Sequence, residues 1–136
     1  MENLAEGEIR EVIHGFYRAI INKDVDRMFS FCTQDITLRW ASFTFKGRTE
    51  VGRWLEELYK LFTKMGIEEA NLVINKNEAA HDFVIRVTTP NGRRGILPTK
   101  GSYKLKDGKL QEIQMTPSWG FLIFSREEAK KLGFEI

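Results

Sequence analysis

Apolar residues in the first half of the chain recur at the 3.6-residue period of an α-helix in three separate stretches. The spacing predicts helices over residues 3–23, 24–35 and 47–66. Asp24 is suited to cap the second helix, because its carboxylate can accept hydrogen bonds from the free N–H groups of the first turn. Gly66 is suited to the position just after the third helix, where the backbone is commonly left-handed.

Elsewhere apolar and polar residues alternate, as they do along a half-buried β-strand. The alternation predicts strands over residues 36–40, 41–45, 70–74, 80–89, 96–105 and 110–116. Pro90–Gly92 and Lys106–Lys109 are typical hairpin turns. A bulge is expected near Pro98 or Gly101. The segment after Gly66 is therefore predicted to be an antiparallel meander.

These elements define one α+β domain over residues 1–136, in which three N-terminal helices pack on one curved antiparallel sheet. A chain of 136 residues is long enough to bury a sizeable core. Residues 118–136 form a C-terminal extension, with a short helix predicted over Ser125–Leu132. The extension either covers a sheet edge or a dimer interface, or lies as a lid over the mouth of a binding site.

Composition narrows the partners that are expected. A net charge of +2, without long blocks of one sign, argues against a nucleic-acid or membrane surface as partner. No apolar run approaches the roughly 18 residues that cross a bilayer, and the polar opening residues do not resemble a signal peptide. The single cysteine, Cys32, cannot form an internal disulfide and is predicted to be an inert apolar residue of the second helix. A cytoplasmic protein is expected.

Three short segments carry a resemblance to a known superfamily. They are Phe16–Ile20 on the first helix, Asn22–Asp26 at the joint between helices, and Phe45–Arg48 before the third helix. In this order they resemble the nuclear transport factor 2-like (NTF2-like) superfamily, which includes ketosteroid isomerases and SnoaL-type cyclases. The resemblance implies a cystatin-like cone with a cavity between helices and sheet, and a homodimer formed through the sheet.

The chemistry of ketosteroid isomerases is not carried over by this resemblance. Their aspartate base aligns at or next to Trp40, their oxyanion-hole tyrosine at Phe16, and their protonated acid near Gly101, so none of the three residue types is retained. Tyr17 follows Phe16 on the flank of the helix, but one residue along a helix rotates the side chain by about 100°. Steroid isomerisation by that mechanism is therefore not expected.

The carboxylate–arginine arrangement of epoxide hydrolases from the same superfamily is not reproduced either. Asp82 and Arg86 lie four residues apart, about 13 Å at the rise of a strand. A cross-strand group of Arg39, Asp82, Arg86 and Glu112 is one alternative. The other alternative places these charges on a solvated sheet face or at a subunit interface.

His81 is the most suggestive catalytic candidate, with Asp82 beside it. His81 shares a strand face with apolar residues, and a half-buried imidazole can act as acid or base near neutral pH. The competing interpretation is a histidine at the edge of the core, satisfied by a backbone carbonyl. His14, next to Arg18 on the helical wheel, is expected in solvent. The two histidines lack the spacing of a metal site, so no metal and no cofactor is expected.

An apolar cavity with a few polar groups is the usual form of a small-molecule site. The predicted pocket residues, mostly aromatic, come from separate elements that converge in a cone fold: Phe16, Tyr17, Trp40, Trp54, Phe83, Tyr103, Met115 and Trp119. The leading hypothesis is binding of a small apolar molecule in this pocket. The alternatives are a lyase, isomerase or hydrolase that uses His81 or Asp82, and a protein-association module whose cavity is filled by its own side chains.

Overall fold

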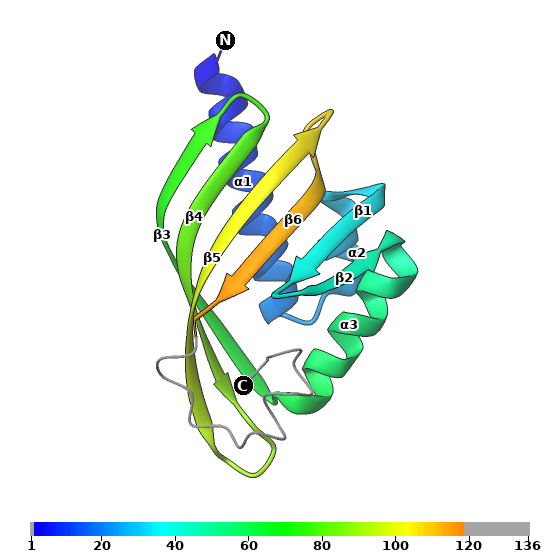
Figure 1. The fold of residues 1–136 in the computed structure, drawn as a ribbon, viewed down its shortest axis with the longest axis vertical. Coiled ribbons are helices and arrows are strands. Elements are labelled where there is room, and N and C mark those ends of the chain that lie inside the picture. The colour runs from blue at the N-terminus through cyan, green and yellow to red at the C-terminus, as the bar shows by residue number, and fades with distance from the viewer. Residues whose placement is uncertain (1, 119–136) are drawn as a thin grey trace.

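The computed structural model describes the backbone of residues 2–118 and the side chains of residues 6–118. Within these residues three helices and six strands follow one another, and Figure 1 shows how they are arranged. In order they are α1 (Glu2–Ile21), α2 (Val25–Ser30), β1 (Cys32–Trp40), β2 (Phe43–Lys46), α3 (Gly47–Leu61), β3 (Lys64–Asn75), β4 (Glu78–Thr88), β5 (Arg94–Lys106) and β6 (Lys109–Pro117). Two helices precede the first strand, and the third follows the first two strands.

The six strands form one sheet in the order β2-β1-β6-β5-β4-β3. β3 to β6 are the predicted antiparallel meander, but β1 pairs with β6 in parallel, so the prediction of a fully antiparallel sheet was wrong. The parallel pair is accommodated because α3 and four strands separate β1 from β6 along the chain, which is enough for a crossover. The long strands β3, β4 and β5 curve, with α1 behind the sheet and α3 beside β1 and β2 (Figure 1).

The core lies between the helices and one face of the sheet. Its sheet side follows the predicted alternation, with Ile36, Leu38 and Trp40 buried on β1 and Phe83 and Val87 buried on β4. Burial of side chains of this size contributes roughly 1.5–3 kcal/mol each, which is the main force holding helices and sheet together.

The two predicted helix ends at Asp35 and Gly66 were wrong. Asp24 does cap α2 by accepting from the backbone N–H of Arg27, but α2 ends at Ser30, and Cys32 begins a strand rather than lying on a helix. Pairing of β1 with β6 overrides the helical period here, since Cys32 lies opposite Leu110. Gly66 likewise lies within β3.

The early end of α3 follows from the length of β4. Phe62 is extended, with φ −128° and ψ 126°, and the N–H of Thr63 donates to the carbonyl of Thr88 at 2.8 Å. Lys64 then pairs with Thr88, so β3 covers the whole edge of β4. A helix continued to Gly66 would have left these backbone groups without ladder partners.

The predicted bulge near Pro98 or Gly101 was also wrong, because β4 and β5 pair without a break from Glu78 to Thr88. The carbonyl of Pro98 accepts from Ser118 on the β6 side, just beyond the last β5–β6 pair. The nitrogen of Pro98 faces the same side, so its missing N–H does not interrupt the ladder between β4 and β5. Register shifts lie instead between Ala70 and Val73 in β3, between Cys32 and Thr37 in β1, and between Lys104 and Leu105 in β5.

The predicted extension lies almost wholly outside the described residues, including Trp119 and the helix expected over Ser125–Leu132. Of the helices that the structure describes, none has the length and apolar character needed to cross a membrane.

Candidate functional site

A small apolar cavity lies between α1, α3 and the core face of the sheet. It has a volume of about 30 Å³. Its lining comes from α1, from α3 and the residue that follows it, and from the strands β1, β3, β4, β5 and β6. The lining residues are Tyr17, Ile20, Trp40, Trp54, Leu58, Phe62, Met65, Ile67, Ile85, Val87, Leu97 and Met115. The rings of Trp40 and Trp54 lie 6.1 Å apart between their centroids. Trp54 and Ile85 are only half-buried, which places this side of the wall near the surface.

Five polar side chains form a chain of contacts next to this cavity. The hydroxyl of Tyr17 is hydrogen-bonded to the hydroxyl of Tyr103, which lies 2.6 Å from Nε2 of His81. Nδ1 of His81 lies 3.6 Å from Oε1 of Glu69, and the other Glu69 oxygen is paired with Nδ1 of His14. Tyr17 belongs both to this polar chain and to the cavity wall.

Local backbone structure explains how these residues meet. His14 and Tyr17 are three residues apart on α1, so both point to the same side of that helix. Glu69 pairs with Phe83 and therefore faces the core with it. Opposite His81, β3 carries two residues against one, and Asn71 has a φ of +57°, which are the marks of a β-bulge.

Gly101 makes room for the hydroxyl of Tyr103. A Cβ atom at residue 101 would lie 2.5 Å from that oxygen and 2.9 Å from Cε1 of Phe83. Gly101 also pairs directly with His81 on β4. The absence of a side chain at this position is therefore what allows the Tyr103 hydroxyl to reach the imidazole.

Burial keeps the polar chain neutral at its centre. Burial lowers the pKa of His81 to about 4, with a further lowering from His14 and a smaller opposing effect from Asp82. Burial likewise raises the pKa of the Tyr17 and Tyr103 hydroxyls well above the ordinary value. At pH 7 the imidazole and both phenols are uncharged, so they act as hydrogen-bonding groups rather than as ions.

The structure brings four of the predicted pocket residues onto the cavity wall: Tyr17, Trp40, Trp54 and Met115. Phe16, Phe83 and Tyr103 are buried in the core but do not line this cavity. Tyr17 is buried rather than on the flank of its helix, because the sheet covers a face of α1 broad enough to take both Phe16 and Tyr17.

Among the titratable residues, Asp82 and His14 differ from their predicted roles, and Glu69 was not predicted. His81 is buried as a member of the polar chain, whereas Asp82 is exposed on the other face of β4, away from it, as the alternation of a strand requires. His14 remains 42% exposed, as expected, but it is also paired with Glu69. Glu69 was missed, because the third helix was expected to reach Gly66 and the strand to begin at Ala70. The alternation of Met65, Ile67 and Glu69 was the signal that could have found it.

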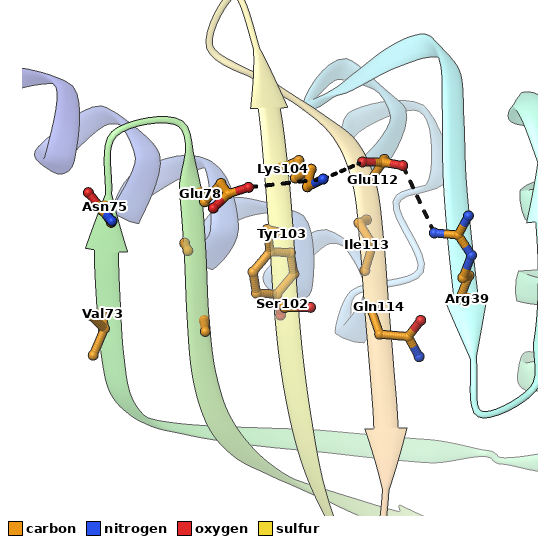
Figure 2. A pocket seen from close by; sticks show the side chains of 12 residues that line it. Arg39, Val73, Asn75, Glu78, Ser102, Tyr103, Lys104, Glu112, Ile113 and Gln114 are labelled. Atoms are coloured by element: carbon orange, nitrogen blue, oxygen red, sulfur yellow. Dashed lines mark ion pairs between the residues drawn. The ribbon is translucent and has the colours of Figure 1, made fainter.

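The outer face of the sheet carries a separate groove of about 450 Å³. Across it runs a row of four charges on neighbouring strands, Glu78, Lys104, Glu112 and Arg39, which Figure 2 shows. The Nζ atom of Lys104 lies 4.0 Å from Oε1 of Glu78 and 3.6 Å from Oε2 of Glu112. Glu112 and Arg39 of the predicted cross-strand group are thus paired at 4.0 Å, whereas Arg86 pairs with Glu68 at 2.8 Å.

The side chains present do not point to a metal. Within the described part of the chain, no group of three or more His, Cys, Asp or Glu residues could hold a metal ion. Cys32 is buried, and burial raises the pKa of its thiol to about 12, so it does not form a nucleophilic thiolate at neutral pH.

Comparison with known proteins agrees with the architecture. Residues 13–113 match the SnoaL-like domain family, so the chain belongs to that family. Among curated proteins, none matches the sequence significantly. The fold is that of NTF2-like proteins.

Three solved structures illustrate the similarity of fold. An NTF2-like protein of unknown function from Burkholderia pseudomallei has a TM-score of 0.75 at 14% identity, covering 82% of this chain and 91% of that one. A LEH-like epoxide hydrolase from M. tuberculosis has a TM-score of 0.72 at 12% identity, covering 82% and 84%. The epoxide hydrolase/cyclase-like enzyme SalBIII, described with a role in pyran ring formation in salinomycin, has a TM-score of 0.75 at 17% identity, covering 83% and 92%.

Proposed function

We propose that the protein binds a small, largely apolar molecule in the cavity between α1, α3 and the sheet. The observation that carries this proposal is the apolar wall of the cavity, with the paired indoles of Trp40 and Trp54 on one side and Tyr17 linking it to a buried polar chain. Convergent apolar side chains beside a few polar groups are what a ligand site requires. Structural neighbours that include an epoxide hydrolase and a cyclase-like enzyme support a small organic ligand.

The ligand must enlarge the cavity on entering. A volume of about 30 Å³ holds little more than one water molecule, whereas ligand pockets are roughly 300–1,000 Å³. The half-buried wall residues Trp54, Met65, Ile67 and Ile85 lie where such an opening costs the fewest core contacts. Movement of α3 against β3 and β4 is therefore the expected route of entry.

The proposal is tested first by native mass spectrometry of gently purified protein, which we expect to retain a small apolar molecule. NMR titration with naphthalene, an apolar probe without hydrogen-bonding groups, then locates the site. Leu97→Phe should fill the cavity and abolish saturable binding, whereas Val73→Phe, on the exposed outer face, should leave it unchanged. A protein that carries no molecule and gives no saturable shifts with naphthalene would refute the proposal.

Catalysis at His81 is the second candidate function, supported by its bond to Tyr103 and its proximity to Glu69. Enzymes activate a hydroxyl group by placing it next to an imidazole that is itself oriented by a carboxylate. Tyr103, His81 and Glu69 lie in this spatial order. Asp82 is left out of this candidate because it is exposed on the opposite face. His81→Gln should abolish turnover of any substrate found in a screen, and unchanged turnover would exclude this role.

We also propose that the outer face of the sheet pairs with a second copy of the chain. The charges of Glu78, Lys104, Glu112 and Arg39 alternate in sign across β4, β5, β6 and β1. A two-fold axis parallel to the strands reverses the row, so that each charge meets one of opposite sign. An axis along the row would instead oppose like charges. The pattern of charges therefore favours a dimer whose two-fold axis is parallel to the strands.

Sedimentation velocity tests this arrangement. Lys104→Glu should weaken the dimer, and adding Glu112→Lys should restore it, because the axis brings these two positions together between copies. Arg53→Glu, exposed on α3 rather than on the outer face of the sheet, is the matched control. A monomer at all concentrations would exclude the dimer, and a failure of the double variant to restore association would exclude this axis.

A further inference from the structure

In the buried polar chain, the donors and acceptors determine which atom gives the proton in each hydrogen bond, and this order of donation is the direction of the chain. An ionised Glu69 offers only acceptors, so the nitrogen of His81 that faces it should carry the proton. A neutral imidazole has one N–H, so Nε2 is then an acceptor, and the Tyr103 hydroxyl must donate to it. The oxygen of Tyr103 in turn accepts from the hydroxyl of Tyr17.

The opposite direction is disfavoured by the contact between Glu69 and His81. With the proton on Nε2, the lone pair of Nδ1 would face the carboxylate oxygen Oε1 at 3.6 Å. Neither atom has another hydrogen-bond partner among the described residues, and both are buried. Two facing acceptors without a proton between them lose their hydration without compensation, which costs roughly 1–3 kcal/mol for each group.

We infer that Glu69 fixes the direction of this chain and thereby leaves the oxygen of Tyr17 as a hydrogen-bond acceptor for the ligand. The site then prefers apolar molecules that carry a hydroxyl group, such as a phenol or an enol, over molecules that carry only a carbonyl group. This inference rests on the proposed binding function and adds the chemical class of the ligand. Glu69 is a positioning residue, since it acts through His81 and the two tyrosines.

Tyr17 is the residue through which the direction of the polar chain can affect a ligand. Among the five members of the polar chain, it alone lines the cavity, and it does so through the carbon atoms of its ring, because the wall exposes no polar atom before the cavity enlarges. Its only proton is directed to Tyr103, so its remaining capacity is that of an acceptor. As the cavity enlarges around a ligand, a hydroxyl that reaches this oxygen gains a hydrogen bond, and a carbonyl oxygen meets another acceptor.

The tautomer of His81 tests the direction without any ligand. In ¹⁵N-labelled protein at pH 7.5, long-range ¹H–¹⁵N spectra should show Nδ1 of His81 protonated and Nε2 unprotonated. Glu69→Gln should invert the tautomer, because the amide can donate to Nδ1. Glu68→Gln, the adjacent but exposed glutamate, should change nothing. A wild-type proton on Nε2, or a Glu69→Gln variant that is folded and keeps the wild-type tautomer, would overturn the inference.

Two probes of equal heavy-atom count test the ligand class. By NMR titration, 4-ethylphenol should bind the wild-type protein more tightly than acetophenone, by about fivefold for one neutral hydrogen bond. Tyr17→Phe should remove the preference, and Glu69→Gln should reverse it. Equal affinities in the wild-type protein would overturn the inference while leaving the proposed function intact. If neither these probes nor naphthalene bind, the proposed function fails and the preference fails with it.

Discussion

Acidification should destabilise the folded protein through one buried side chain, His81. Its pKa falls from 6.5 to about 4 on folding, chiefly because burial disfavours the imidazolium ion. Each unit of pKa corresponds to about 1.4 kcal/mol, so protonation of His81 removes about 3 kcal/mol of stability in all. The sign follows from proton uptake. Between pH 6.5 and 4 the unfolded chain binds the proton and the folded protein does not, so the full stability is present above pH 6.5 and is lost as the pH falls through this range.

The assay is urea unfolding of the wild-type protein and of His81→Gln at several pH values between 7.5 and 4. The difference between the two free energies of unfolding should shrink by about 3 kcal/mol toward pH 4, and titration of the surface carboxylates cancels in that difference. His14→Gln, which changes the other of the two histidines, should keep most of the pH dependence. A His81→Gln curve that runs parallel to the wild-type curve would refute the reasoning.

Three further predictions concern the free energy of unfolding, each measured by urea denaturation. Gly101→Ala should destabilise by about 1–3 kcal/mol, because its Cβ would overlap the Tyr103 hydroxyl at 2.5 Å; Gly7→Ala, with open space around the helix position, should be neutral or stabilising. Asp24→Ala should cost about 1 kcal/mol by removing the α2 cap, and an unchanged value would show that the 3.3 Å bond contributes nothing. Arg48→Met should cost about 1–3 kcal/mol, because two backbone carbonyls lose their guanidinium donor; Arg53→Met, an exposed change on the same helix, is the control.

Local sequence patterns predicted the elements well wherever the pattern and the sheet pairing agree. The hairpin turns, the buried faces of β1 and β4 and the cap at Asp24 are all set by neighbours in the sequence. The helix ends at Asp35 and Gly66 were wrong because pairing partners far along the chain decide them. Helical periodicity continues past Leu61, but the free edge of β4 requires a strand there.

The sequence predicted only part of the candidate site, because strand pairing between distant residues decides the rest. His81 could be singled out from the sequence, since it is a polar group within an apolar strand face. Tyr17 was a pocket candidate from the flank of its helix. Glu69 was missed, because the alternation that points it inward is recognised only if β3 is taken to begin before Gly66. The bulge opposite His81 also depends on pairing, and no glycine or proline in the bulge marks it in the sequence.

The resemblance to ketosteroid isomerases implied their protonated acid near Gly101 and did not reveal the hydroxyl of Tyr103. In the structure the Tyr103 oxygen lies only 2.5 Å from where a Cβ atom of residue 101 would be. The polar group is therefore supplied by a residue two positions further along the strand. It is a phenol rather than a carboxylic acid, and burial raises the pKa of both tyrosines, which keeps them neutral. His81, the base that contacts Tyr103, is weak at a pKa of about 4. A site of this kind orients a ligand by hydrogen bonds far better than it removes a proton from carbon, which is why binding ranks above base catalysis as the proposed function.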